Sequence, residues 1–405
     1  MTKSLLTKTC IVDDGELIEI LDLGMHPFAD TFIPSERLYE SEPIFPLICG
    51  LCTKCGLVQL MCLTNPAARY GQYEYSYTSS NSEYARNHWS EFAIETSLKS
   101  KPLKNILEIG SNDGFLLSKY AAQGHSVLGV DSSSSMAQLA MEQGIETLNK
   151  IFTFQVAEEL AASKPGFDLI VANNVLNHSN NPLDFLSGVE ILLSPEGKFV
   201  FEVPYWLSSI KTGNFDQIYH EHISYFTIFN VTNLVRLTNL NIQSITLNNY
   251  HGGSLRITLS KLPPASYRDW EPLALIEAES KLLSLDTYVK FKKIIDYRRN
   301  KTLSQIYLIL ANQPNSTIIL AGAAAKANTF INYYSLNSTT IHCITDSSLH
   351  KIGKYTPVSR IPILPDSAVK DFENLYVLPT AWNIREIIMG SIVKLNPNAK
   401  ELSCE

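Results

Sequence analysis

Short apolar runs alternate with amphipathic segments through the middle of the chain. Four of these runs have the length and apolar content of buried strands, and the segment after the first has the spacing of a helix. Strands that alternate with helices indicate a parallel sheet whose two faces are covered. Ligands of such sheets bind beyond the carboxyl ends of the strands. The predicted strands are residues 105–110, 126–131, 167–172 and 198–203, and the predicted helix is residues 115–123.

The final third of the chain repeats this pattern. Residues 317–322, 340–346 and 374–379 predict strands, and a turn of small residues at 323–328 opens a helix. A helical stretch at 265–299 separates this part from the first. The sequence therefore predicts an α/β fold with two sheet-containing domains joined by helix.

Cysteine is concentrated at the front of the chain, where five of the seven cysteines lie within the first 62 residues. Cys52 and Cys55 form a CxxC knuckle followed by glycine, and zinc takes four such ligands in a tetrahedron. Cys10 is the third predicted ligand, and Asp13 occupies the position that would complete a first CxxC. Thiol redox chemistry is the alternative, but no thioredoxin-like pattern surrounds the knuckle. The other candidates for the fourth ligand are Cys49, Cys62 and His26.

The composition narrows the class of protein. A length of 405 residues with 45% hydrophobic content fits two or three domains with an ample core. The net charge of −7 offers no general attraction to nucleic acid or to an anionic membrane, which argues against a zinc-knuckle binding protein. No apolar run approaches the roughly 20 residues needed to span a bilayer, and residues 1–8 lack the apolar core of a signal peptide. We expect a cytoplasmic protein whose cysteines are thiols or metal ligands.

A glycine loop follows the first central strand and opens a helix. It has the form E-x-G-x-x-x-G from Glu108 to Gly114, and Asp131 ends the next strand, where an acid accepts hydrogen bonds from ribose hydroxyls. NAD would require the phosphate-binding GxGxxG spacing, which is absent. Asp113 is awkward beside a pyrophosphate but tolerable beside a sulfonium, which favours S-adenosylmethionine (SAM). The predicted cofactor-binding residues are Glu108, Gly110, Asn112, Asp113, Gly114, Asp131, Asn173 and Asn174.

The first eight residues of the segment 215–226 gather two imidazoles, two carboxylates and a phenol. Clustered titratable groups of this kind suit proton transfer near neutral pH. A polar loop without a ligand, or a metal site that uses both histidines, are the alternatives. Residues 70–101 are rich in tyrosine and serine, and form either a cap over a ligand or a connector with a helix at 82–98.

Together these motifs resemble the sugar C-methyltransferases that act on nucleotide-linked 4-keto-deoxysugars. The resemblance covers nearly the whole chain, and the matching segments are residues 21–30, 52–60, 108–114, 174–178, 215–226, 251–256, 323–329, 346 with 351–355, and 381–383.

The resemblance implies a zinc-binding domain at 1–68, a connector or cap at 69–100, and a class I SAM-binding methyltransferase domain at 101–262. A linking helix and a C-terminal Rossmann-like domain that helps to hold the nucleotide sugar would follow at 263–405. It also implies a SAM-dependent C-methyltransferase that acts on a nucleotide sugar, commonly at C3. The protein would work as a monomer or homodimer, without nucleic acid or membrane.

The resemblance assigns roles to the clustered groups. His222 would be the base that removes the proton next to the ketone, and His178 would contact the keto or enolate oxygen or relay the proton. Tyr219 and Glu221 would orient His222 or bind sugar hydroxyls, and Lys326 would contact phosphate. The other candidate substrate contacts are Tyr75 and Tyr77, which could close the site, and His251, Arg256 and Asn328. For His251 and Arg256 the alternative is a β-hairpin with exposed basic side chains.

Two segments depart from the family pattern. The first CxxC is replaced by Cys10-Ile11-Val12-Asp13, so Asp13 is the fourth ligand, Cys49 substitutes for it, or the metal is lost. The loop at 321–327 has fewer glycines than usual and no aromatic residue, so its nucleotide contacts differ. An oxygen or nitrogen methyl acceptor, or an NAD-linked nucleotide-sugar oxidoreductase, are the alternative functions.

Overall fold

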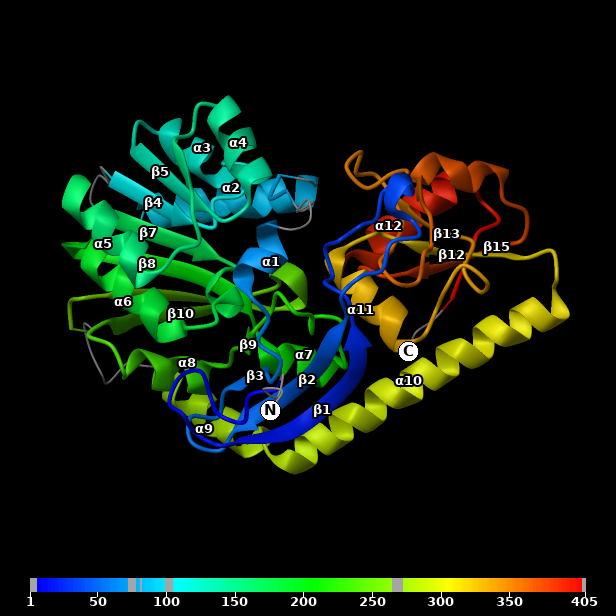
Figure 1. Ribbon diagram of the computed structural model, residues 1–405, viewed down its shortest axis with the longest axis horizontal. Coiled ribbons are helices and arrows are strands. Elements are labelled where there is room, and N and C mark those ends of the chain that lie inside the picture. The colour runs from blue at the N-terminus through cyan, green and yellow to red at the C-terminus, as the bar shows by residue number, and fades with distance from the viewer. Residues whose placement is uncertain (1–5, 72–77, 81, 99–104, 264–271, 403–405) are drawn as a thin grey trace. The chain divides into compact units, whose positions relative to one another are not determined.

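A computed structural model gives the fold of the chain (Figure 1). It describes residues 6–71, 78–80, 82–98, 105–263 and 272–402. The chain divides into two compact units. The first comprises Met1–Glu19, Cys49–Ser208 and His222–Ser284, and the second comprises Ile20–Ile48, Ser209–Glu221 and Leu285–Glu405.

The first unit is built on a seven-stranded sheet in the order β10-β11-β8-β7-β4-β5-β6 (Figure 1). Strands β8, β7, β4, β5 and β6 pair in parallel, and β11 is antiparallel to both of its neighbours. The predicted parallel strands are confirmed, and β10 and β11 form a hairpin at the edge of the sheet. The strands are β4 Asn105–Ile109, β5 Ser126–Asp131, β6 Thr147–Asn149, β7 Phe167–Asn173, β8 Leu193–Pro204, β10 Asn241–Asn248 and β11 Ser254–Ser260.

Helices cover both faces of this sheet. Val200 of β8 packs in the cluster that contains Trp89, Phe92 and Tyr120 from α2 and α3. The ring of Phe199, the preceding residue, contacts Phe185 of α6. Because successive side chains of a strand point to opposite faces, α6 covers the face away from α2 and α3. The helices of this part are α2 Glu83–Leu98, α3 Phe115–Ala121, α4 Ser134–Glu142, α5 Phe154–Ser163 and α6 Pro182–Leu192.

Side-chain caps start three of these helices. Ser133, Thr153 and Asn181 each accept a hydrogen bond from the backbone N–H three residues later. Such caps satisfy N–H groups that have no partner within the helix. Pro182 follows Asn181 at the first helical position, where a missing N–H costs nothing.

A small four-stranded sheet has the order β1-β2-β3-β9. Strand β3 pairs antiparallel with both β2 and β9, so the CxxC hairpin is tied to the strand that follows His222. The strands are β1 Leu17–His26, β2 Phe45–Cys52, β3 Val58–Leu60 and β9 Ser224–Tyr225. The remaining helices of this part are α1 Pro66–Gly71, α7 Trp206–Thr212, α8 Ile228–Val235 and α9 Pro272–Leu282.

The second unit contains a five-stranded parallel sheet in the order β14-β13-β12-β15-β16. Its predicted strands are confirmed, but β13 begins three residues late because Thr340 N donates to Asn337 O and closes a turn there. The strands are β12 Thr317–Ala321, β13 Cys343–Asp346, β14 Ile363–Pro365, β15 Leu375–Pro379 and β16 Lys400–Glu401, and the helices are α10 Leu285–Asn312, α11 Ala325–Tyr333 and α12 Arg385–Leu395.

Helices α9 and α10 occupy the described part of the predicted helical stretch 265–299. Within the described residues, no helix combines the length and the apolar content that crossing a membrane requires.

Candidate functional site

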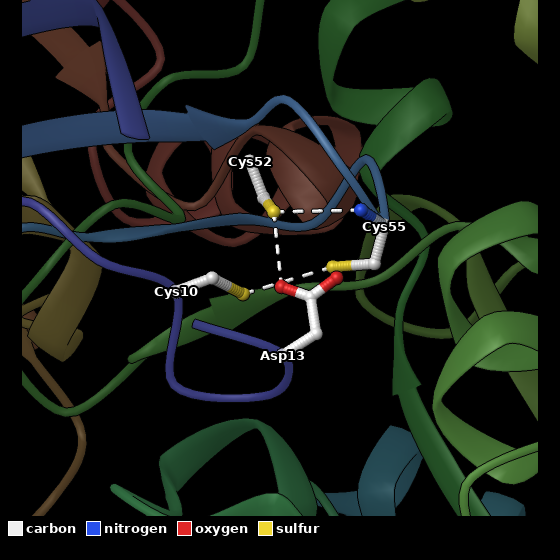
Figure 2. A group of neighbouring side chains, drawn as sticks. All are labelled: Cys10, Asp13, Cys52 and Cys55. Carbon is white, nitrogen blue, oxygen red and sulfur yellow. Dashed lines mark hydrogen bonds between the residues drawn. The ribbon is translucent and has the colours of Figure 1, made fainter. Parts of the chain in front are cut away.

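Side chains of three cysteines and one aspartate lie close together in the N-terminal part of the first unit (Figure 2). Cys10 and Asp13 lie in the turn before β1, Cys52 ends β2, and Cys55 lies in the turn before β3. The sulfur atoms of Cys10 and Cys55 are 3.6 Å apart, and Cys52 Sγ donates to Asp13 Oδ1 at 3.3 Å. All four ligand atoms lie within 4.8 Å of one another. Such a cluster has the size of a tetrahedral zinc shell.

The backbone around the cluster favours thiolates. The N–H groups of Lys54 and Cys55 approach Cys52 Sγ at 3.4 Å, and that of Val12 approaches Cys10 Sγ at 3.4 Å. The contact with Cys55 and the amide of Val12 lower the pKa of Cys10 to about 7 despite its burial. Burial raises the pKa of Cys52, and the contact with Cys10 raises the pKa of Cys55, although backbone N–H groups act in the opposite direction on both. Zinc binds the thiolate form, so these donors prepare the site for metal.

Glycine is required where the two halves of this cluster meet. A Cβ at Gly15 would lie 2.6 Å from Cys52 Sγ. Gly56 has a φ of +74°, and a Cβ there would lie 2.8 Å from the Phe229 ring of α8. The knuckle is also tied to α8 by the hydrogen bond from Asn233 Nδ2 to Cys55 O at 3.2 Å.

The donor set fits zinc, with Asp13 in place of the fourth sulfur. Three thiolates and a carboxylate are ordinary zinc ligands. The structure brings Cys10, Cys52 and Cys55 together as predicted, but it does not bring Cys49 into this group. Cys49 is buried in β2, and burial raises the pKa of its thiol. Nor do Cys62 or His26 join the group, and His26 Nε2 lies 2.9 Å from the carbonyl of Leu23.

The glycine loop lies between β4 and α3, at the carboxyl edge of the large sheet. Gly110 has a φ of +73°, and a Cβ there would lie 2.3 Å from Val175 Cγ2. Gly114 caps α3 with a φ of +76°. Only glycine satisfies both the left-handed backbone and the close approach at position 110.

Asp131 ends β5 beside this loop. Its carboxylate accepts the N–H of Asn112 and the N–H of Ser133, both at 2.8 Å. Burial nevertheless raises the pKa of Asp131 to about 6, with a smaller contribution from Asp113. The carboxylate is thus held in a fixed orientation, as a ribose-binding acid requires.

Several buried polar atoms near the loop have no partner among the described residues. They include Glu108 Oε2, Asn173 Nδ2 and Asn174 Oδ1. Desolvation, and then the charges of Asp113 and Asp131, raise the pKa of Glu108 well above its usual value. Buried polar groups are normally paired, so unpaired ones at the carboxyl ends of β4 and β7 mark a place for a polar ligand. These residues fit SAM.

The side chains of Asp113 and Asn112 accept hydrogen bonds from Ser79 and Ser80. Asp113 accepts hydrogen bonds from the hydroxyl of Ser79 and, at 2.5 Å, from that of Ser80. Asn112 Oδ1 accepts the N–H of Ser79 at 2.8 Å. The sequence reading missed this role of Ser79 and Ser80, although the density of serine there indicated a cap.

Two histidines lie side by side beyond β7. The short 3-10 helix Leu176–His178 places His178 with its ring centroid 5.0 Å from that of His222. Burial, followed by the charges of His222 and Arg69, lowers the pKa of His178 well below its usual value. The pair combines a neutral imidazole with a second titratable ring.

The backbone beside His222 is fixed on two sides. Ile223 N donates to Asn177 O at 2.8 Å, and Leu60 N donates to Ile223 O at 2.9 Å. The segment after His222 is therefore pinned between the His178 turn and strand β3. These bonds keep the loop that carries His222 in register with His178.

The residues that precede His222 in the segment 215–226 belong to the second unit. His220 is fully buried against the rings of Phe28 and Phe45, and its Nε2 lies 3.3 Å from Pro46 O. Those contacts are structural. Glu221 is buried, and Tyr219 is half-buried in the same turn.

The predicted substrate contacts are divided between the units. His251 lies in the first unit with a φ of +52°, packed on Tyr250. Arg256 forms ion pairs with Glu202, at 2.5 Å, and with Glu95. These ion pairs give Arg256 a structural role. Tyr75 and Tyr77 lie outside the described residues.

Lys326 and Asn328 lie in α11 of the second unit. Burial lowers the pKa of Lys326, which the Asp216 carboxylate partly offsets. Burial also raises the pKa of Asp216, so this pair is held away from water. Asn328 Nδ2 donates to Ala29 O, and the side chain is buried. Asn328 thus anchors α11 within its own unit.

Comparisons with known proteins account for most of the chain. Residues 10–70 match the family described as "Putative zinc binding domain", residues 82–245 match "Methyltransferase domain", and residues 249–399 match "C-methyltransferase C-terminal domain". The chain is 28% identical over 383 residues to the C-methyltransferase NovU of Streptomyces niveus, covering 93% of this chain and 89% of NovU. The protein is a SAM-dependent methyltransferase.

More distant relatives match this methyltransferase only in part. A ubiquinone biosynthesis O-methyltransferase of Bordetella parapertussis (strain 12822) is 30% identical over 110 residues, which are 27% of this chain and 45% of the relative. A solved structure of the plantazolicin methyltransferase BpumL with SAH is 18% identical, with a TM-score of 0.34, covering 51% of this chain and 79% of that one.

Proposed function

We propose that this methyltransferase transfers a methyl group to a carbon atom of a nucleotide-linked 4-keto-deoxysugar, at C3. The observation that carries the proposal is the pair of His178 and His222, whose rings are 5.0 Å apart at the carboxyl edge of the cofactor-binding sheet. Methyl transfer to an oxygen needs only one base. Transfer to a carbon needs a base for a C–H bond and a second group for the oxygen that becomes an enolate. The similarity to NovU over 93% of the chain supports the same activity.

The chemistry requires two steps. Neutral His222 takes the C3 proton, because the adjacent C4 ketone makes that proton acidic, and the electrons of the C–H bond form the enolate. His178 donates a hydrogen bond to the C4 oxygen while it carries this charge. When bound, SAM supplies an electrophilic methyl group. A new C3–methyl bond forms as the sulfur–methyl bond breaks, and the proton on His222 passes to solvent.

The cofactor would be held by the residues around the glycine loop. Asp131 accepts the ribose hydroxyls, Gly110 lets the backbone approach the ligand, and Asn173 and Asn174 provide the unpaired amide atoms beside β7. Glu108 supplies a further polar atom at the end of β4.

The remaining predicted residues have supporting roles in this proposal. Tyr219 and Glu221 orient His222 or bind sugar hydroxyls, and Lys326 contacts phosphate at the start of α11. Zinc is structural, held by Cys10, Cys52, Cys55 and Asp13. The domain division would follow the ranges 1–68, 69–100, 101–262 and 263–405.

Exchange of the sugar's C3 proton with solvent tests the proposal. The protein is incubated with a nucleotide-linked 4-keto-6-deoxysugar in deuterium oxide, and deuterium at C3 is followed by NMR, with and without SAM. We expect exchange in the wild type and none in His222→Ala, while His350→Ala, an exposed histidine, is unchanged. Methyl transfer without C3 exchange in any condition would favour an oxygen or nitrogen acceptor.

A further inference from the structure

Tyr70 makes a direct hydrogen bond to the ring of His178. The hydroxyl oxygen of Tyr70 lies 2.9 Å from Nδ1 of His178, and the two ring planes are 7° apart. Tyr70 lies at the end of α1, far in sequence from the residues that form the sheet edge. The sequence pattern gave it no chemical role.

The segments that carry these two side chains are tied together nearby. Arg69 Nη2 donates to Asn180 Oδ1 at 2.7 Å, and Asn180 Nδ2 donates to Thr64 O at 3.0 Å. The contact between Tyr70 and His178 is therefore supported by two further hydrogen bonds between the α1 segment and the turn that carries His178. A linkage of this kind keeps the imidazole plane fixed, as a group that acts on a substrate requires.

The chemistry of the two groups sets the direction of their hydrogen bond. A phenol hydroxyl, with a pKa near 10, is a good donor, and the unprotonated nitrogen of a neutral imidazole is a good acceptor. In the opposite arrangement an imidazole N–H would donate to the phenol oxygen, and a neutral imidazole N–H is a weaker acid than a phenol. Tyr70 therefore donates to Nδ1, and the ring proton of neutral His178 resides on Nε2.

Burial keeps the ring neutral, and the groups that face it act in the same direction. Arg69 and His222 are the charged or titratable groups whose fields act on His178, and both disfavour a second proton on it. The Tyr70 hydroxyl faces Nδ1. His178 Nε2 is shielded from solvent and has no hydrogen-bond partner among the described residues. A buried N–H without a partner marks a place where a ligand oxygen completes the bond.

We infer that Tyr70 is a positioning residue that selects the Nε2–H tautomer of His178, so that Nε2 donates to the oxygen that becomes negative during methyl transfer. The inference rests on the proposed function, because that reaction is what produces an enolate oxygen. A neutral imidazole suits this role: it stabilises the developing charge by a hydrogen bond without giving up its proton entirely. Tyr70 itself does not touch the substrate.

Nitrogen NMR of the histidine rings tests the inference directly. Protein labelled with ¹⁵N-histidine is recorded at neutral pH, and the His178 signals are assigned by their loss in His178→Asn. We expect a non-protonated Nδ1 and a protonated Nε2 in the wild type. In Tyr70→Phe, which keeps the ring but removes the hydroxyl, we expect a mixture of tautomers.

Kinetics provide the second readout. Tyr70→Phe should lower kcat by roughly tenfold with little change in KM, as expected for the loss of one interaction that acts in the transition state. Tyr84→Phe is the matched control, since among the described residues the Tyr84 hydroxyl makes only a long contact, to Asn249 O at 3.5 Å. Unchanged thermal unfolding of Tyr70→Phe would exclude loss of the fold as the cause.

The two readouts separate this inference from the proposed function. The NMR spectrum needs no methyl acceptor, so a failure to methylate ketosugars counts against the proposed function alone. An Nδ1–H tautomer or an imidazolium ring in the wild type would overturn the inference. So would a tautomer that is the same in Tyr70→Phe as in the wild type.

Discussion

The imidazole rings of His178 and His222 lie 5.0 Å apart, although α6, β8 and α7 lie between the two residues in the chain. The hydrogen bond from Ile223 N to Asn177 O holds the two segments together. Two imidazoles are thereby placed at one edge of the sheet that carries the predicted cofactor residues, and the proposed mechanism uses them as base and hydrogen-bond donor.

Replacement of His222, the base of the proposed mechanism, should slow methyl transfer strongly while leaving the cofactor site intact. We expect His222→Asn to lower kcat by about 10²- to 10⁴-fold, the usual contribution of general base catalysis. SAM affinity, measured by calorimetry, should stay within error of the wild type, because His222 does not contribute to the glycine loop. His350→Asn serves as the exposed control. A variant that retains most of its activity would show that another group removes the proton.

SAM binding should weaken in acid because of Asp131. Its pKa is raised to about 6, so the carboxylate is charged above that pH and gains a proton below it. The charged form accepts hydrogen bonds from ribose hydroxyls, and protonation removes an acceptor. We therefore expect the Kd for SAM to rise as the pH falls from about 7 to about 5. Asp131→Asn should bind weakly at every pH and lose most of this dependence. An Asp131→Asn variant with the affinity and pH profile of the wild type would contradict the assignment.

Gly110 should tolerate no side chain. An added Cβ would meet Val175 Cγ2 at 2.3 Å, and the φ of +73° is strained for any other residue. Gly124 is a matched control, because its φ of +86° is similarly positive and nothing lies within 4 Å of an added Cβ. We expect Gly110→Ala to lose SAM binding by calorimetry, whereas Gly124→Ala only destabilises the protein, by about 1 kcal/mol. Equal affinities in the two variants would mean that the loop does not contact the cofactor.

Zinc content should depend on Asp13 and not on Cys49. We expect Asp13→Ala and Cys52→Ser to lose metal, as measured by elemental analysis of purified protein, and to unfold at lower temperature. Asp13→Cys should retain metal, and its cobalt-substituted form should show stronger sulfur-to-metal absorption, because a fourth thiolate replaces the carboxylate. Cys49→Ser should keep a full complement of zinc. Loss of zinc in Cys49→Ser with retention in Asp13→Ala would reverse the assignment.

Local sequence patterns predicted the residues at the carboxyl edge of the sheet, but not the side chains from distant segments that contact them. The strand, glycine loop and acid from Glu108 to Asp131 are consecutive in the chain, so spacing alone locates them. The fourth metal ligand was harder to predict from the sequence. Cys49 and Cys52 are three residues apart in β2, so their side chains point to opposite faces of the strand and cannot bind the same ion. Asp13 instead shares the turn that presents Cys10.

Contacts between distant segments explain the other differences. His220 and His222 look equivalent in sequence, yet His220 packs between Phe28 and Phe45. Ser79, Ser80 and Tyr70 reach the loop and His178 only through the tertiary fold. No local spacing encodes such contacts, so periodicity could not reveal them.

The position of the transferred methyl group tests the central claim most directly. The protein is supplied with SAM carrying a ¹³C-methyl group and a nucleotide-linked 4-keto-6-deoxysugar, and the product is analysed by ¹³C–¹H correlation NMR. The account predicts a methyl carbon bonded to C3, with loss of the C3 proton. A methyl group on oxygen or nitrogen would contradict it.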